Sequence, residues 1–137
     1  MSEKCSLVFY TTPEGWLYSE LAGLAWLEGR RSSRLGISRK DGIATLRLPA
    51  KVDGLPVYGL SMTFDKYDDA DVLVIPEGVA LIAGRAFALR RRLKRVEIPS
   101  TLREVAGDAF ADTALPPARK RELYAIRMAD PAEKEGL

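Results

Sequence analysis

The sequence contains no histidine and only one cysteine, Cys5, among its 137 residues. Without histidine the chain lacks the commonest general base, the usual catalytic triad and the ring nitrogens of most zinc sites. A lone cysteine cannot form a disulfide within the chain, and Cys5 has no histidine to activate its thiol. We therefore expect no enzymatic activity, no cofactor and no bound metal.

Long apolar runs and a strong net charge are also missing. The most apolar segment, around residues 21–27, is too short to span a bilayer, and the first residues lack the pattern of a signal peptide. Together with the single cysteine, these features predict a cytoplasmic protein that does not enter a membrane. The net charge is +2, so the chain as a whole has no strong attraction for nucleic acid.

The chain contains an internal repeat. Residues 73–87 (LVIPEGVALIAGRAF) align without a gap to residues 96–110 (VEIPSTLREVAGDAF), 23 positions further on. A degenerate earlier copy begins with LRLP at residues 46–49 and spans 27 residues, because it includes the turn-forming segment KVDGLPVYGL; its Phe64 matches Phe87. A fixed period in the twenties indicates one supersecondary unit per repeat, stacked on its neighbours.

This repeat resembles that of the BspA-type leucine-rich repeat family of bacteria. The shared positions are a strand ending in Ile-Pro, two apolar residues three apart, a glycine and an Ala-Phe pair. In the middle copy they are Ile75, Pro76, Val79, Ile82, Gly84, Ala86 and Phe87. The resemblance covers roughly residues 35–115. It implies a leucine-rich repeat fold whose exposed sheet binds other molecules.

The predicted fold is a short α+β solenoid that forms a single domain over residues 1–137. About three leucine-rich repeats of 23–27 residues occupy residues 43–115. Their short strands are expected to stack in register as a parallel sheet. The proline after each strand has no N–H to donate and therefore ends it.

Both ends of the array are predicted to be covered, because a terminal repeat would otherwise expose its apolar edge. Residues 1–42 form an N-terminal α/β cap. It begins with a strand at residues 7–10 and continues with a helix from Thr12 to Gly29, for which a pair of strands is the alternative. Residues 116–137 form a C-terminal capping helix, over residues 118–128, and a polar tail.

Alternation along the predicted strands identifies the side chains that face solvent. Leu46, Leu73 and Val96 are expected to point inward and their neighbours outward. The outward positions form two rows across the sheet, Thr45–Val72–Arg95 and Arg47–Val74–Glu97. Two valines at outward positions with charges around them predict a protein-binding surface. An N-terminal element folded over the valines is the alternative.

Two charged clusters occupy equivalent loops of successive copies. The basic run comprises Arg85, Arg90, Arg91, Arg92, Lys94 and Arg95, and the acidic cluster comprises Asp65, Asp68, Asp69 and Asp71. The basic run is a candidate site for phosphate or an acidic protein, but between Arg90 and Arg95 no aromatic residue interleaves with it to stack on bases. The two clusters are expected to lie side by side and to attract each other. The acidic spacing matches no calcium-binding loop.

These features predict a non-enzymatic protein–protein interaction module. The chain is interpreted as a small adaptor or inhibitor that binds a larger protein through its exposed sheet and flanking charged loops. One alternative is a nucleic-acid-associated protein that uses residues 85–95. Another is a fragment of a bacterial surface adhesin. The sequence is also compatible with a homodimer.

Overall fold

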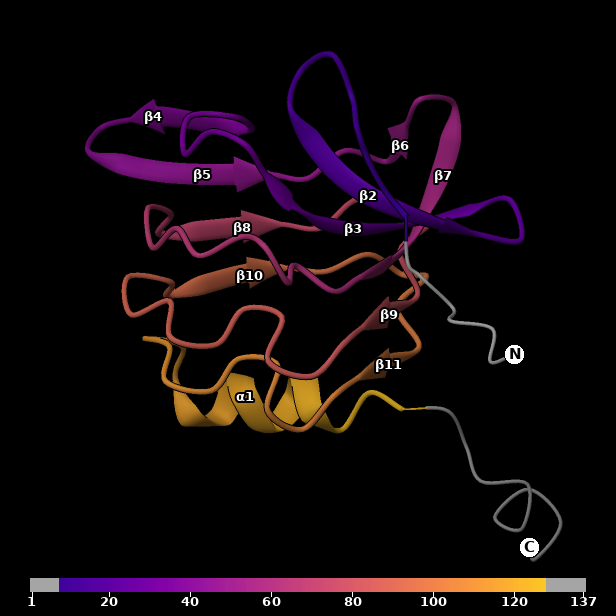
Figure 1. Cartoon of the computed structure of the whole chain (residues 1–137). Helices are drawn as coiled ribbons and strands as arrows, with labels where there is room; N and C mark the ends of the chain where they lie inside the picture. Colours follow the sequence, from indigo (N-terminus) through magenta and orange to yellow (C-terminus); the bar gives the residue numbers. More distant parts are fainter. Residues whose placement is uncertain (1–7, 128–137) are drawn as a thin grey trace, which may run out of the picture.

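The computed structural model describes residues 8–127, which form two sheets and one short helix (Figure 1). Three strands from successive copies lie side by side in one sheet. They are β5 (Ile43–Arg47), β8 (Val72–Val74) and β10 (Arg95–Glu97), and they pair in parallel. Leu46, Leu73 and Val96 share one register across these strands and are at most 3% exposed. The predicted parallel stack and its register are therefore confirmed.

The strand β4 (Ile37–Lys40) extends this sheet beyond β5. It pairs with β5 in an antiparallel hairpin, whose two turn residues, Asp41 and Gly42, have φ angles of +52° and +79°. Positive φ at both positions is the signature of the two-residue turn that matches strand twist. This hairpin leads directly into the first repeat.

The second half of each copy contributes to another sheet, which the sequence pattern did not predict. Its parallel strands are β7 (Leu55–Leu60), β9 (Leu81–Ile82) and β11 (Glu104–Val105). The chain therefore passes from one sheet to the other within each copy, and Figure 1 shows the two stacks on opposite sides of the core. A short strand, β6 (Lys51–Val52), pairs with β7 in the inserted segment of the first copy.

The helix predicted between Thr12 and Gly29 is wrong. This segment forms an antiparallel pair, β2 (Trp16–Leu21) and β3 (Leu24–Arg30), preceded by β1 (Phe9–Thr11). The turn between β2 and β3 has positive φ at both Ala22 and Gly23, +55° and +78°, which a helix cannot accommodate. Thr12, expected to cap a helix, instead closes the β1–β2 turn by accepting a hydrogen bond from the Trp16 N–H at 3.0 Å.

The strand β3 occupies the place that a preceding repeat would take. It pairs in parallel with β7, and the Phe64 N–H donates to the Glu28 carbonyl at 2.8 Å. The backbones approach so closely that a Cβ at Gly29 would lie 2.9 Å from the backbone of residues 64 and 65. The loop of the first copy therefore runs alongside the end of β3. The predicted equivalence of Phe64 with Phe87 is wrong. Phe64 is 47% exposed and packs edge-on against Phe9, with ring centroids 4.9 Å apart.

Phe87 and Phe110 form the centre of the core between the two sheets. Both are fully buried, and their rings stack at 5.5 Å with an interplanar angle of 12°. Hydrogen bonds between side chain and backbone repeat the period of 23 residues around this core. Examples join Gly78 to Thr101, Arg85 to Asp108, and Ser100 to Glu77. The repeats are thus connected by polar contacts at their turns as well as by apolar packing.

The helix α1 (Pro117–Tyr124) packs beyond the last copy. Leu123 is fully buried, and the Tyr124 hydroxyl accepts a hydrogen bond from the Phe110 N–H at 3.1 Å. The Val105 N–H of β11 donates to the Ile126 carbonyl, so the segment after the helix covers the edge of that strand. The predicted C-terminal helix is present, but it ends at Tyr124 rather than at residue 128, which lies outside the described residues.

Tyr18 fastens the N-terminal hairpin to the first copy. Its hydroxyl donates to Asp53 Oδ2 at 2.7 Å, and only 5% of the residue is exposed. The hydrogen bond to Asp53, followed by burial and the negative charge of Asp53, raises the pKa of Tyr18 to about 12. The protonated phenol is therefore part of the contact between β2 and the turn that joins β6 to β7.

We predict that Phe110→Ala lowers the free energy of unfolding by about 3–5 kcal/mol, because it leaves a cavity against Phe87. Phe64→Ala is the matched control, since it removes the same ring from a partly exposed site and should cost less than half as much. Urea denaturation of both variants provides the measurement. Equal losses would contradict the different environments of the two phenylalanines.

We also predict a loss of stability at alkaline pH that depends on Tyr18. An unfolded tyrosine has a pKa of about 10, so its contribution is fully present below pH 10 and is lost as pH rises from about 10 to about 12. The free energy of unfolding, measured at about pH 9 and about pH 11, should fall more in the wild type than in Tyr18→Phe. An identical fall in both proteins would rule out this contribution.

Candidate interaction surface

The outer face of the β4-β5-β8-β10 sheet carries the predicted binding residues. Pairing places Thr45, Val72 and Arg95 in one row and Arg47, Val74 and Glu97 in the next. Arg47, Arg95 and Glu97 are exposed, whereas Thr45 and Val74 are half-buried. The two rows therefore exist as predicted, and Arg47, Arg95 and Glu97 are their exposed members.

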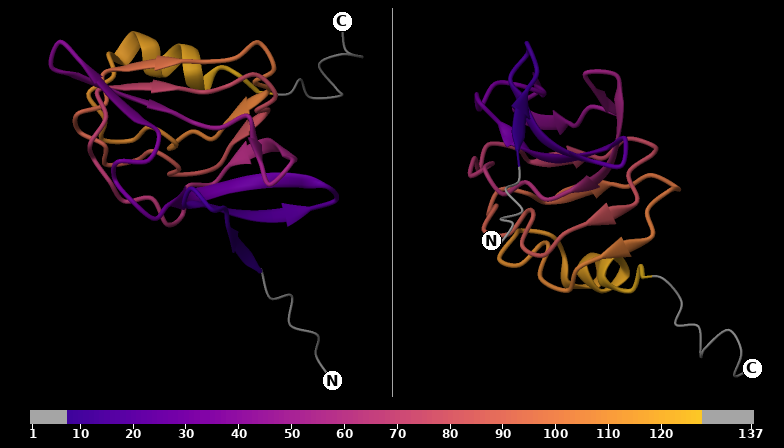
Figure 2. Two further views of the ribbon diagram at one scale, coloured as in Figure 1. Left: turned by 90° about the horizontal axis from the view of Figure 1, so that it is seen from above. Right: turned by 45° about the vertical axis from the view of Figure 1, so that its right-hand side comes forward.

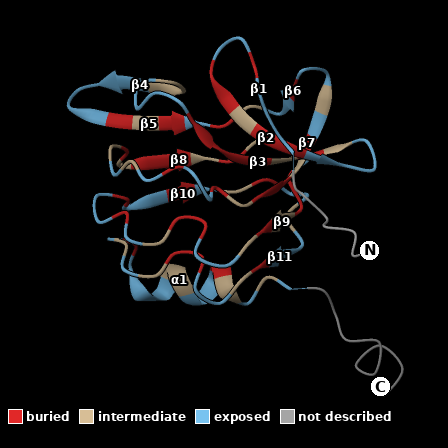
Figure 3. Cartoon of the chain, in the orientation of Figure 1, coloured by how far each residue is buried: buried red, intermediate tan, exposed pale blue. Residues whose placement is uncertain are grey.

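Val72 does not belong to the accessible surface, so its prediction as an exposed valine is wrong. It is 2% exposed, and Figure 3 shows β8 mainly buried between its neighbours. Val72 lies on the central strand, in register between Thr45 and Arg95, with neighbouring strands about 4.8 Å away on both sides. The long apolar stem of an arginine can cover such a neighbour.

Ile43 supplies the apolar surface that Val72 does not. It is 38% exposed at the start of β5, on the same side as Thr45 and Arg47. These three side chains line a shallow hollow together with Ser38, Lys40 and Asp41. The alternation that identified Thr45 and Arg47 extends to Ile43, so the same signal could have included it. The accessible face therefore combines Ile43 and Val74 with the cations Lys40, Arg47 and Arg95.

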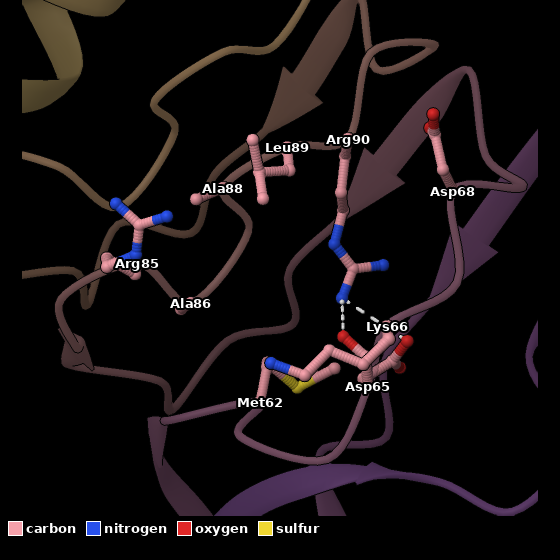
Figure 4. A pocket seen from close by; sticks show the side chains of 9 residues that line it. All are labelled: Met62, Asp65, Lys66, Asp68, Arg85, Ala86, Ala88, Leu89 and Arg90. Carbon is pink, nitrogen blue, oxygen red and sulfur yellow. Dashed lines mark hydrogen bonds and ion pairs between the residues drawn. The ribbon is translucent and has the colours of Figure 1, made fainter.

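The basic run does not act as one exposed surface. Arg85, Arg91, Arg92, Lys94 and Arg95 are exposed, but Arg90 is 6% exposed. The Arg90 guanidinium points into the loop of the preceding copy (Figure 4). There it donates to the carbonyls of Tyr67 at 2.8 Å and Asp65 at 2.9 Å. Arg90 is therefore a structural residue rather than a residue available to a partner.

A buried carboxylate accounts for this arrangement. Asp65 is 4% exposed and accepts a bidentate hydrogen bond from Arg30, at 2.7 Å from Nε and 3.2 Å from Nη2. Arg90 Nη2 lies 3.2 Å from the same carboxylate, and Arg30 Nη2 also contacts Asp69 at 3.2 Å. We call Arg30, Asp65, Asp69 and Arg90 the buried ion cluster. Two cations and two anions balance its charge.

The environment of the cluster shifts the pKa values of its two arginines in opposite directions. Burial acts to lower the pKa of Arg30, but the hydrogen bond and charge of Asp65, with the charge of Asp69, outweigh it and raise the pKa. For Arg90 burial outweighs the attraction of Asp65, and the pKa is lowered. Both guanidinium groups remain charged because arginine does not deprotonate in proteins.

The other acidic residues of the predicted cluster bind the backbone of neighbouring loops. The two Asp68 oxygens accept hydrogen bonds from the N–H groups of Arg91 and Arg92, both at 3.1 Å. Asp71 accepts one from the Ala44 N–H at 2.9 Å, which, with the charges of Arg92 and Lys94, lowers the pKa of Asp71 despite its burial. The expectation that acidic and basic loops lie side by side is confirmed.

A hollow between the loops of the first two copies lies beside this cluster (Figure 4). Lys66 and Arg85 line it together with Leu89, which is 49% exposed. Its acidic residues are engaged by arginine side chains and backbone N–H groups. Within residues 8–127, no three histidine, cysteine or acidic side chains are grouped to hold a metal ion. Cys5 lies outside the described residues.

We predict that Asp65→Asn costs about 3–5 kcal/mol of unfolding free energy, because it leaves two buried cations without their shared anion. Asp68→Asn makes the same chemical change at an exposed site and should cost less than about 1.5 kcal/mol, the range of an ordinary hydrogen bond. Chemical denaturation at neutral pH distinguishes the two. Equal effects would show that the buried ion cluster has no special role.

Comparison with known proteins supports the fold. No protein-family model matches the chain, and no curated protein is significantly similar to it. Among solved structures, a leucine-rich repeat protein of Treponema pallidum is similar, with a TM-score of 0.55 and 22% sequence identity. The similarity covers 77% of this chain but 42% of the Treponema protein, so this chain spans less than half of that length. No helix in residues 8–127 is a candidate membrane span. The fold is therefore like that of a leucine-rich repeat protein.

Proposed function

We propose that this chain is a non-enzymatic protein-interaction module, built as a short leucine-rich repeat solenoid of the BspA type. The outer face of the β4-β5-β8-β10 sheet is its binding surface. The observation that carries this proposal is the in-register row Arg47–Val74–Glu97, which gathers side chains from three copies on one accessible face. In this proposal the β2–β3 hairpin and α1 serve as the caps of the array.

The composition of this face indicates the chemistry of the partner. Ile43 and Val74 offer apolar area, and Lys40, Arg47 and Arg95 surround it with positive charge. Glu97 is the acidic residue on the strands of this sheet. An apolar centre with a charged rim is typical of transient protein interfaces. A partner surface with a small apolar area and acidic residues around it fits this face best.

The proposed role is that of a small adaptor or inhibitor in the cytoplasm. The single cysteine favours a reducing compartment. An adaptor would leave the activity of its partner unchanged on binding, whereas an inhibitor would lower it. An activity assay on the partner therefore separates the two roles.

The basic loop is a weaker candidate for the binding surface. Arg90 is buried, Asp68 binds the backbone of Arg91 and Arg92, and Arg92 also faces Asp71 at 3.5 Å. Adjacent acids reduce the positive potential that phosphate binding requires. This arrangement favours a protein partner at the sheet over nucleic acid at the loop.

We predict that Val74→Glu weakens partner binding at least tenfold, about 1.4 kcal/mol, because a partner would have to desolvate the new carboxylate. Purified wild-type and variant proteins would be immobilised as matched baits. The amount of each captured protein, and its affinity for each bait, would then be compared. The double variant Arg91→Glu and Arg92→Glu is the control for the loop. Loss of binding in the double variant alone would move the site to the loop and contradict the proposal.

A further inference from the structure

The first strand of the larger sheet has an open edge. Within residues 8–127, β1 pairs with β2 and with no other strand, and Figure 2 shows it at the margin of the hairpin. The N–H of Thr12 donates to the Trp16 carbonyl at 2.9 Å, so Thr12 and Trp16 form a hydrogen-bonded pair of the ladder. Because hydrogen-bonded pairs alternate in an antiparallel ladder, Tyr10 bonds to Tyr18, and Phe9 and Thr11 direct their N–H and C=O groups to the open edge.

Among residues 8–127, nothing gives this edge the protection found on the other outer strands. Folded proteins usually guard an edge with charge, proline or a covering element. The strand β4 carries Arg39 and Lys40, the β10 edge receives Arg119 Nη2 at 2.9 Å on the Val96 carbonyl, and β11 bonds to Ile126. By contrast, β1 contains no charged residue and no proline.

Exposed aromatic side chains accompany the open edge. Phe9 is 41% exposed, Tyr10 is 44% exposed, and Phe64, which packs against Phe9, is 47% exposed. Tyr10 stacks on Tyr18 across the β1–β2 pair, with ring centroids 5.3 Å apart. Such a group of apolar side chains beside unpaired backbone indicates a surface that another strand can cover.

We propose that the open edge of β1 pairs with the same edge of a second copy of this chain, forming a two-fold symmetric dimer. The groups available at the edge are self-complementary. In an antiparallel pair centred on Tyr10, Phe9 of each copy bonds to Thr11 of the other, and all the free backbone groups of both residues are satisfied. The absence of charge on β1 leaves no like-charge repulsion in this pair. A self-pair of β4 would instead bring arginines and lysines together.

This register makes a specific prediction about residue 10. The two Tyr10 residues face each other as a pair without hydrogen bonds, with their Cα atoms about 4.5 Å apart. Their rings would continue the stack that each Tyr10 forms with Tyr18. The two Thr11 residues are displaced along the strands, and their Cα atoms are about 8 Å apart. Cysteines placed at position 10 of the two copies can therefore form a disulfide, whereas cysteines placed at position 11 cannot.

Cysteine cross-linking tests this register in a Cys5→Ser background. We expect Tyr10→Cys to form a covalent dimer on mild oxidation and Thr11→Cys, the matched control, to remain monomeric on a denaturing non-reducing gel. Cross-linking of Thr11→Cys in preference to Tyr10→Cys, or of neither, would overturn the proposed register. Circular dichroism confirms that both variants are folded.

Sedimentation velocity across a range of concentrations tests the dimer in the otherwise unmodified chain. The wild type should dimerise, and Tyr10→Lys and Tyr10→Glu should each raise the dimer dissociation constant at least tenfold by facing like charges. Mixing these two variants should restore a heterodimer. A wild type that stays monomeric at its highest soluble concentration, or variants that dimerise equally well, would overturn the proposal. Val74→Glu should leave the dimer intact, because Val74 lies on the other sheet. A monomeric wild type would therefore contradict the dimer without contradicting the proposed binding face.

Discussion

The N-terminal hairpin and the first two repeats are held together by the carboxylate of Asp65, which is buried between Arg30 and Arg90. Arg30 ends the N-terminal hairpin, Asp65 lies in the loop of the first copy, and Arg90 lies in the loop of the second. Apolar packing alone tolerates small slips between layers, whereas a bidentate arginine–carboxylate pair has a fixed geometry. Because desolvation makes such a cluster a weak source of net stability, we infer that it mainly specifies how the hairpin and the two copies fit together.

The same contact determines which charges remain available at the surface. Arg90 and Asp65 are withdrawn from the basic and acidic loops, and Asp68 and Asp71 bind backbone N–H groups of adjacent segments. The exposed cations of the loop therefore lie beside acids, whereas those of the sheet face surround apolar area. This distribution of charge is the reason that the sheet, rather than the loop, is the better candidate for binding a partner. The open edge of β1 is a separate surface with a different chemistry.

Several structural features followed from sequence pattern because they repeat. The spacing of Leu46, Leu73 and Val96 predicted the register of three parallel strands. The repeated Ala-Phe pair placed Phe87 and Phe110 at equivalent positions, and both are fully buried. The pattern failed at Phe64, in the irregular loop of the first copy, and at the N-terminal hairpin, which has no equivalent among the repeats. Thr12 and the leucines after it satisfied the spacing of a helix. The turn at Ala22 and Gly23 and the pairing of β3 with β7 made this segment a pair of strands instead.

The sequence by itself determined the repeat, its period and the alternation of inward and outward residues, because these depend on local spacing and on backbone geometry that every copy shares. Tertiary structure alone decided the burial of Val72 on a central strand, the exposure of Phe64, and the burial of Asp65 and Arg90 as partners of Arg30. Each of these outcomes depends on which distant segment lies alongside. A charged residue has the same appearance in sequence whether it faces water or a buried counter-charge, so spacing within one chain cannot distinguish the two.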